Sequence, residues 1–327
     1  MWSVIWAVVL AVLAVYSLMG ALVSFPPAVQ GSELDLFIPP PWPAEHTDSE
    51  GRALAYKQGG RYQNPWMQDR PSVLSFFSSL LFGTDESNIP GAAQLAETMP
   101  VRPPDWLDNT TAFLPADCRL TWLGHATVLA ELDGAAILTD PMFSERASPV
   151  GFAGPARYTA PACTVEQLPA VAAVVISHSH YDHLDLPTTR QLAATQPDIQ
   201  WFVPVGLGGW LREEAGAARV VELAWWEAAP LQGTQISLTL TPANHWGKRG
   251  LGDDNRALWG SWAVVGPRHR FWFGGDTGYC EQFKTIGDKL GPFDLAAIPI
   301  GEQQSSGTEC INQVFKYHNI HKKFNCL

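Results

Sequence analysis

The segment from Ile176 to Leu186, ISHSHYDHLDL, gathers three of the nine histidines of the chain and two aspartates. His178 and His180 are two residues apart, so on an extended backbone their imidazoles point the same way and supply half of a tetrahedral zinc site. Asp182 and His183 diverge from that pair and suit a second cation. Two cations roughly 3.5–4 Å apart hold a bridging water that ionises near neutral pH. The pattern therefore predicts a hydrolytic site with two zinc ions.

Two further ligands are expected at the ends of other apolar strands. Asp276 follows two glycines in FWFGGDTG, and a carboxylate at that point bridges both ions. His245 in TPANHWG lies just past another strand, and we predict that it is a further metal ligand. Asp182 and Asp276 are the predicted catalytic carboxylates.

Three more polar residues lie close to the same strand ends. Asp140 in AILTDP is expected to accept the second N–H of a ligand histidine and so set its tautomer; the alternative is a turn cap before Pro141. His125 in WLGHAT either lines the site or forms a hydrogen bond in the core, and we favour the core. Asp185 is expected to cap a helix that begins near Pro187.

The hydrophobic pattern supplies the strands that must position these residues. Residues 119–132 and 135–140 are predicted to form two strands joined by Asp133-Gly134, and the apolar run 170–177 a strand buried on both faces. Further strands are expected at 201–205, 219–226, 236–243, 260–266, 270–276 and 293–301, and helices at 186–196, 207–214 and 281–290. Groups of strands with helices between them predict layered sheets with the helices outside.

The chain of 327 residues divides by composition into four parts. Residues 1–24 contain the uncharged run Trp2–Val23, which is long enough to span the roughly 30 Å apolar core of a bilayer. We expect a single membrane anchor there; export followed by signal cleavage is the alternative. Residues 25–115 are expected to form a linker and an N-terminal arm, 116–301 the hydrolase domain, and 302–327 an atypical tail.

Charge and cysteine content exclude other classes of protein. The formal net charge is −11, whereas a nucleic-acid surface needs clustered Lys and Arg, so no nucleic-acid partner is expected. The five cysteines are odd in number and widely spaced, which argues against a disulfide framework or a cysteine zinc site.

The motifs HSHYDH and GGDTG, with the histidine between them, resemble the metallo-β-lactamase superfamily of hydrolases. The likeness is closer to the N-acyl-phosphatidylethanolamine-hydrolysing phospholipase D type, through TWLGHATVLAEL, ILTDPMFSERASP and FDLAAIPIG, and it covers roughly residues 60–301. It implies an αββα sandwich with the metal site at one edge of the sheets. It also implies ligands for two zinc ions: His178, His180 and His245 for the first, Asp182 and His183 for the second, and Asp276 between them.

The resemblance further implies a phosphodiesterase that splits N-acyl-phosphatidylethanolamine into phosphatidic acid and N-acylethanolamine, with a metal-bridging hydroxide attacking phosphorus. The partner is then phospholipid at a membrane surface. Trp2–Val23 would tether the chain there, and Trp66, Phe76 and Phe77 would add contacts unless they pack in the core. The alternative is a metallo-hydrolase of another ester or a lactone, and mixed His/Asp sites also accept iron or manganese.

The C-terminus departs from the family pattern. Relatives carry one more histidine, before Trp-Gly on a final strand, which completes the second zinc site. Here the chain continues as EQQSSGTECINQVFKYHNIHKKFNCL, where His318 and His321 stand in a different context. We therefore expect a sandwich that lacks its last strand and exposes a sheet edge, and a weakened second zinc site. A truncated, inactive form that binds at most one metal is a further alternative.

Overall fold

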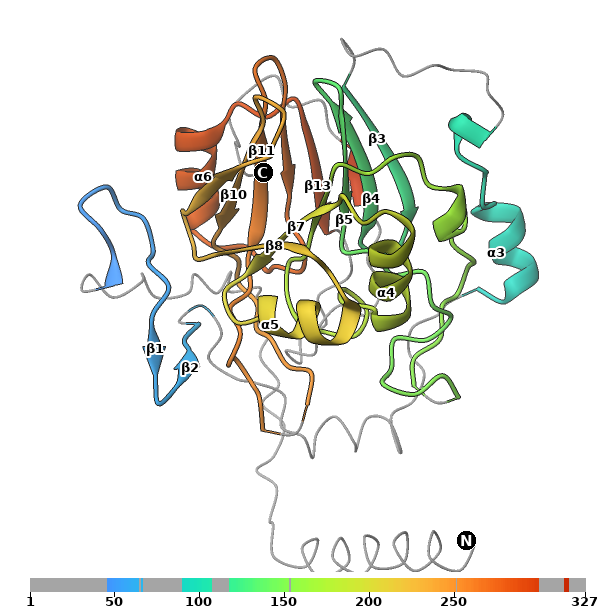
Figure 1. The fold of residues 1–327 in the computed structure, drawn as a ribbon, viewed down its shortest axis with the longest axis horizontal. Coiled ribbons are helices and arrows are strands. Elements are labelled where there is room, and N and C mark those ends of the chain that lie inside the picture. The colour runs from blue at the N-terminus through green and yellow to red at the C-terminus, as the bar shows by residue number, and fades with distance from the viewer. Residues whose placement is uncertain are drawn as a thin grey trace, which may run out of the picture. The chain divides into compact units, whose positions relative to one another are not determined.

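Two six-stranded β-sheets form the centre of the fold (Figure 1). The computed structural model describes residues 46–64, 66, 90–107, 118–152, 154–250, 252–299 and 315–317. The predicted anchor Trp2–Val23, the aromatic pair Phe76 and Phe77, and both tail histidines lie outside these residues. Among the helices that are described, none combines the length and the apolar character needed to cross a bilayer.

The first sheet has the strand order β3-β4-β5-β6-β7-β8. Its strands are β3 (Cys118–Gly124), β4 (Thr127–Leu132), β5 (Ala135–Thr139), β6 (Ala173–Val175), β7 (Gln200–Pro204) and β8 (Arg219–Leu223). Pairing is antiparallel from β3 to β5 and parallel from β5 to β8. Because β5 and β6 are parallel, their carboxyl ends meet at one edge of the sheet, which brings Asp140 beside the segment that begins at Ser177.

The second sheet has the order β14-β13-β12-β11-β10-β9. Its strands are β9 (Ala228–Pro230), β10 (Ser237–Thr241), β11 (Ser261–Val265), β12 (Arg270–Phe273), β13 (Leu295–Pro299) and β14 (Phe315–Tyr317). We expected an open edge beside β13. The tail instead contributes β14, which pairs antiparallel with β13 from Ala297 to Pro299, so this part of the edge is covered.

Helices lie on the outer faces of both sheets. On the first sheet these are α4 (Leu186–Thr195) and α5 (Gly208–Trp210), the latter continued by the π-turn η4 (Leu211–Ala215). On the second sheet it is α6 (Gln282–Leu290) (Figure 1). The smaller elements are β1 (Lys57–Gln58), β2 (Arg61–Tyr62), α3 (Ala92–Thr98) and the turns η2 (Asp105–Leu107) and η3 (Val165–Gln167). The order helix, sheet, sheet, helix confirms the predicted αββα sandwich.

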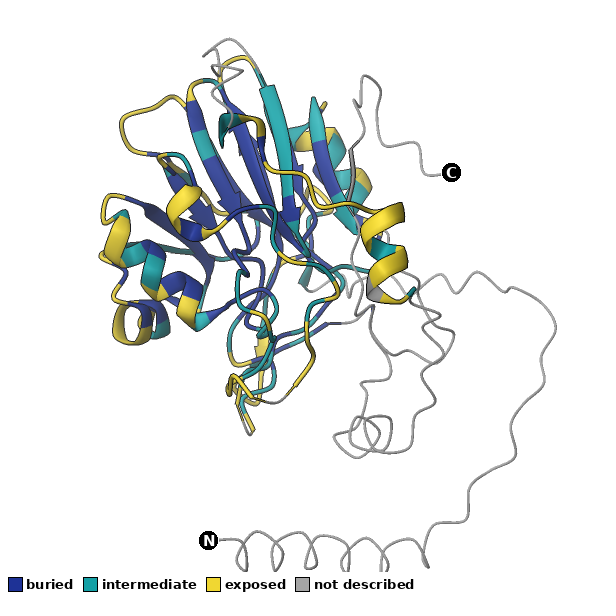
Figure 2. Cartoon of the chain, turned by 90° about the vertical axis from the view of Figure 1, so that its right-hand side faces the viewer, coloured by how far each residue is buried: buried dark blue, intermediate teal, exposed yellow. Residues whose placement is uncertain are grey.

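Alternation along the strands separates the core into layers. Val128 and Ala130 of β4 face the second sheet, while Leu129 between them packs with Leu192 of α4. Trp272 of β12 packs in the outer layer with Ile286 of α6. Figure 2 shows the result, with buried strands in the middle and helices whose outward faces are exposed.

On the N-terminal side one expectation needs correction and one open alternative is decided. The predicted strand 119–132 is a hairpin, since the chain turns at His125 and Ala126 between β3 and β4. Trp66 is only 5% exposed and its ring lies 5.9 Å from that of Trp225, so of the two alternatives for this residue it takes the core and not the bilayer.

Candidate metal centre

Three histidine nitrogens converge at the edge where the two sheets meet. Nε2 of His178 lies 2.8 Å from Nδ1 of His180, and Nε2 of His245 lies 3.1 Å and 3.3 Å from these two atoms. Each imidazole nitrogen carries either one proton or one lone pair, so three that face one another cannot all be satisfied among themselves. A cation at their centre would satisfy all three.

The three histidines of this cluster are in the protonation state that binds metal. Burial lowers the pKa of His178 well below its usual 6.5, that of His180 to about 4 and that of His245 to about 3. The three imidazoles are therefore neutral at pH 7, which is the form that coordinates a divalent cation.

A second group of donors surrounds Nε2 of His183. This atom lies 3.2 Å from Oδ1 of Asp276 and 3.5 Å from Oδ2 of Asp182. Among the described residues, neither His183 Nε2 nor Asp276 Oδ1 has a hydrogen-bond partner, although both atoms are buried. The two atoms face each other at 3.2 Å as an ion pair without a hydrogen bond, so a cation bound beside them would give both a further partner.

The negative charge of this second group fits a divalent cation. Burial opposes ionisation of Asp182 and Asp276, but the neighbouring His183 holds the pKa of both carboxyls below the usual 3.8. Burial likewise disfavours a charged His183, yet Asp276, Asp182 and Asp140 raise its pKa well above 6.5. The two carboxylates thus attract positive charge to this site, and a divalent metal ion can supply that charge.

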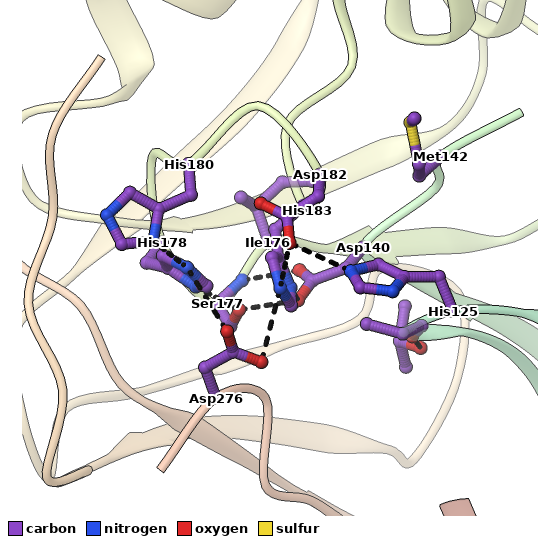
Figure 3. Close-up of polar contacts among 12 residues, drawn as sticks. His125, Asp140, Met142, Ile176, Ser177, His178, His180, Asp182, His183 and Asp276 are labelled. Carbon is purple, nitrogen blue, oxygen red and sulfur yellow. Dashed lines mark hydrogen bonds and ion pairs between the residues drawn. The ribbon is translucent and has the colours of Figure 1, made fainter. Parts of the chain in front are cut away.

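Asp276 faces both groups with different oxygens. Oδ1 lies toward His183, and Oδ2 is 4.0 Å from Nε2 of His178 (Figure 3). Oδ2 is also 3.8 Å from Nε2 of His245. One carboxylate can therefore contact two cations. The structure brings together all six residues predicted to bind metal; that they bind it remains our prediction.

Close contacts between the sheets place Asp276. Gly275, at φ +59°, precedes it, and a Cβ on this glycine would lie 2.6 Å from Cβ of Ser177. Only glycine fits this position. Residues 176–186, which carry the predicted ligands of the first motif and are called the ligand segment below, are also tied to the second sheet. Trp262 Nε1 donates to the carbonyl of Ile176, and the amide of Gly260 donates to the carbonyl of Ser177, both at 2.9 Å.

Asp140 lies behind His183. Its Oδ2 is 2.7 Å from Nδ1 of His183, and its Oδ1 accepts a hydrogen bond from the amide of Ser177 at 2.6 Å. Burial raises the pKa of Asp140, and the bonds from His183 and Ser177 work in the opposite direction. Its φ of +33° is uncommon for a residue with a side chain and shows how closely the end of β5 is constrained.

Asp185 occupies the N-cap position of α4, but its carboxylate does not cap the helix backbone. It accepts hydrogen bonds from Ser144 Oγ at 2.8 Å and from the Thr188 hydroxyl. The predicted role is therefore wrong in detail, since the side chain joins the ligand segment to the loop after β5.

Sequence reasoning missed one residue of the site and favoured the wrong alternative for another. His125, for which we favoured a core hydrogen bond, instead has Nε2 2.9 Å from Oδ2 of Asp182. Asn64 of the N-terminal arm donates through Nδ2 to the backbone carbonyl of His245 and, at 3.1 Å, to Oδ1 of Asn244. No local pattern marks Asn64, because its partner lies 181 residues further along the chain.

The family is decided by a profile described as "Beta-lactamase superfamily domain", which matches residues 135–324, more than half of the chain. The chain belongs to the metallo-β-lactamase superfamily. In keeping with that superfamily and with the clustered donors, it is a metal-dependent hydrolase.

Similarity to individual members of the metallo-β-lactamase superfamily extends over most of the chain. The chain is 41% identical over 271 residues to N-acyl-phosphatidylethanolamine-hydrolyzing phospholipase D 1 of Caenorhabditis elegans. The matched region covers 78% of this chain and 74% of that protein. The chain is 29% identical over 282 residues to the mitochondrial protein of the same name from Saccharomyces cerevisiae, covering 74% and 60%. Among solved structures, a metallo hydrolase of Ignicoccus hospitalis is 21% identical, covers 57% of this chain and 72% of its own, and has a TM-score of 0.43.

Proposed function

We propose that the chain hydrolyses N-acyl-phosphatidylethanolamine to phosphatidic acid and N-acylethanolamine. The observation that carries this proposal is the 41% identity, over 78% of the chain, to a worm protein named for that reaction. The chain keeps, within one cluster, a set of donors suited to a phosphodiesterase.

We assign one cation to His178, His180 and His245 and a second to Asp182 and His183, with Asp276 shared between them. Nitrogen-rich sets of this kind favour zinc. Bound zinc ions lower the pKa of water and stabilise negative charge on phosphoryl oxygens. The residues of the chain hold the donors in place before the substrate arrives: Asp140 orients His183, and Gly275 lets Asp276 approach the ligand segment.

The proposed reaction consumes one water. Its oxygen forms a bond to phosphorus, and the bond between phosphorus and the ethanolamine oxygen breaks. One proton of the water ends on the released alcohol. Both acyl chains of the glycerol remain on the phosphatidic acid, so the substrate must approach the site from a lipid surface.

We further propose that the chain works at a membrane surface, tethered by Trp2–Val23. The loop 144–158 supports such contact on the described part of the chain, because Phe152 at its tip is 86% exposed and Val150 is 39% exposed. The loop is tied to the ligand segment through Ser144 and Asp185, and it borders a cavity of about 460 Å³ whose wall includes Tyr181. Flotation with liposomes, with and without residues 1–30, tests the tether; equal flotation would discard it.

The reaction is tested with vesicles that contain N-acyl-phosphatidylethanolamine, in water enriched in ¹⁸O, with the products measured by mass spectrometry. We expect N-acylethanolamine and phosphatidic acid in equal amounts, with the label in the phosphate. Asp276→Asn should abolish turnover, while Asp288→Asn, an exposed position on α6, should leave it unchanged. Turnover of lactones or simple esters, with none of this phospholipid, would replace the proposal by the alternative hydrolase.

A further inference from the structure

His125 is held in a turn that strains its backbone. It stands between β3 and β4 at φ +50°, a conformation that few residues with side chains adopt. The indole Nε1 of Trp122 donates to its carbonyl at 2.8 Å. At Gly124, before it, an added Cβ would lie 2.5 Å from Nη2 of Arg157, so the turn is packed from outside as well. Strain of this kind is retained mainly where the surroundings enforce it, often at functional sites.

The side chain of His125 reaches the second group of metal donors. Its Nε2 lies 2.9 Å from Oδ2 of Asp182, the oxygen that also lies 3.5 Å from Nε2 of His183. Within the described part of the chain, no side chain other than His125 and His183 forms a hydrogen bond or ion pair with this carboxylate. Asp182 is also 32% exposed, whereas Asp276 is 11% exposed, so it has more freedom to turn toward solvent.

We propose that His125 is a positioning residue that holds the Asp182 carboxylate in place for the second cation. The N–H at Nε2 donates to Oδ2 and fixes the rotation of the carboxylate toward His183. The strained turn and the Trp122 bond fix His125 in its own position. This inference rests on the two-cation site proposed above. His125 acts through Asp182, with which it forms its described ion pair. The described contacts include no ion pair between His125 and Asp276, the carboxylate that joins the two groups of donors.

Two substitutions separate the hydrogen bond from the turn. Asn tolerates a positive φ but is too short to reach Asp182, so His125→Asn keeps the turn and removes the contact. Gln carries an amide nitrogen at about the distance of Nε2, so His125→Gln keeps a donor. His125→Gly, which accommodates the turn with no side chain, serves as the second contact-free variant should His125→Asn fold poorly.

The test is calorimetric titration of each metal-free full-length chain with Zn²⁺. We expect two equivalents for the wild type. In His125→Asn, the Kd of the weaker equivalent should rise about 10- to 100-fold, as is typical when a partner of a metal ligand is removed. The tighter equivalent and the melting temperature of the metal-free protein should not change, and His125→Gln should restore part of the affinity.

Three results would overturn the inference. If His125→Asn and His125→Gly each bind two cations with unchanged affinity, His125 has no positioning role, while the proposed two-cation site stands. A wild-type chain that binds fewer than two cations would remove the proposed site and this inference with it. In a parallel NMR experiment with Co²⁺, the loss from His125→Asn of one strongly shifted imidazole resonance of the wild type would make His125 a ligand instead of a positioning residue.

Discussion

Oδ2 of Asp140 lies 2.7 Å from Nδ1 of His183, and neither side chain has any exposed surface. The pair joins the end of β5 to the ligand segment after β6. The contact leaves Nε2 of His183 facing Asp182 and Asp276, which is the orientation required of a metal ligand.

Replacement of Asp140 by Asn should weaken the binding of the second cation. The amide oxygen can still accept from Nδ1 of His183, but the negative charge is lost and the amide N–H₂, in the place of Oδ1, opposes the backbone N–H of Ser177. We expect metal affinity at the His183 site and the rate of hydrolysis each to fall about 10- to 100-fold. Metal titration and product analysis measure both, and Asp288→Asn is the matched surface control. Full affinity in Asp140→Asn would show that the contact does not orient His183.

Removal of metal should lower both activity and stability. Without a cation the site contains buried donors that lack partners, and a ligand that binds only the folded state stabilises it by about 4 kcal/mol at a free concentration of 1,000 Kd. Treatment with a chelator should therefore abolish turnover and lower the melting temperature, and added Zn²⁺ should restore both. An unchanged melting temperature after confirmed removal of metal would contradict the assigned site.

The N-terminal arm should contribute to the three-histidine group through Asn64. Asn64→Ala leaves the buried carbonyl of His245 without the donor seen in the structure, so we expect a loss of about 1–3 kcal/mol in the free energy of unfolding. The tighter cation should also bind less well. Gln63→Ala is the control, because among the described residues the side-chain amide of Gln63 donates only to carbonyls of the arm itself. Equal stability of the two variants, measured by urea unfolding, would show that the arm does not support His245.

A pH-dependent contact ties the hairpins of the two sheets together at Asp133. This carboxylate, 2% exposed, accepts bonds from the amides of Arg268 and His269 and from both side chains. Burial opposes its charge, but these bonds lower its pKa below the usual 3.8, so its stabilisation is complete above pH 3.8 and is lost as pH falls toward the folded value.

Asp133→Asn should therefore cost about 1–3 kcal/mol at pH 7, and the difference from wild type should shrink below pH 3.8. Unfolding by urea at a series of pH values measures this difference. For Asp288→Asn we expect a small difference throughout. A pH-independent cost for Asp133→Asn would mean that the charge of Asp133 contributes nothing.

The loop 144–158 should contact lipid through Phe152. Phe152→Ser removes a large exposed apolar side chain without disturbing the core, so the unfolding free energy should change by less than about 0.5 kcal/mol. Binding to vesicles and hydrolysis of vesicle substrate should fall several-fold, while hydrolysis of a short-chain soluble analogue should not change. Equal loss with both substrates would place Phe152 in the site and not at the membrane.

Much of the site could be predicted because its ligands are local in sequence. The motif HxHxDH presents four donors within six residues, directly after an apolar strand that places them at the edge of a sheet. Asp276 and His245 lie far from this motif in the sequence and were predicted for a different reason, as polar residues at the ends of apolar strands. Alternation within β4 and the apolar run around β6 likewise indicated layered sheets.

The tertiary structure alone decided the contacts that depend on the path of the chain. His125 reaches Asp182 across 57 residues, and only because β3 and β4 form a hairpin whose turn interrupts what looked like one strand. Asn64 meets His245, and β14 pairs with β13, through contacts that no periodicity encodes. Hydrophobic patterning specifies which face of an element is buried, because burial depends on the residue itself. It does not specify which distant side chain completes a hydrogen bond, because that depends on two backbones meeting at about 3 Å.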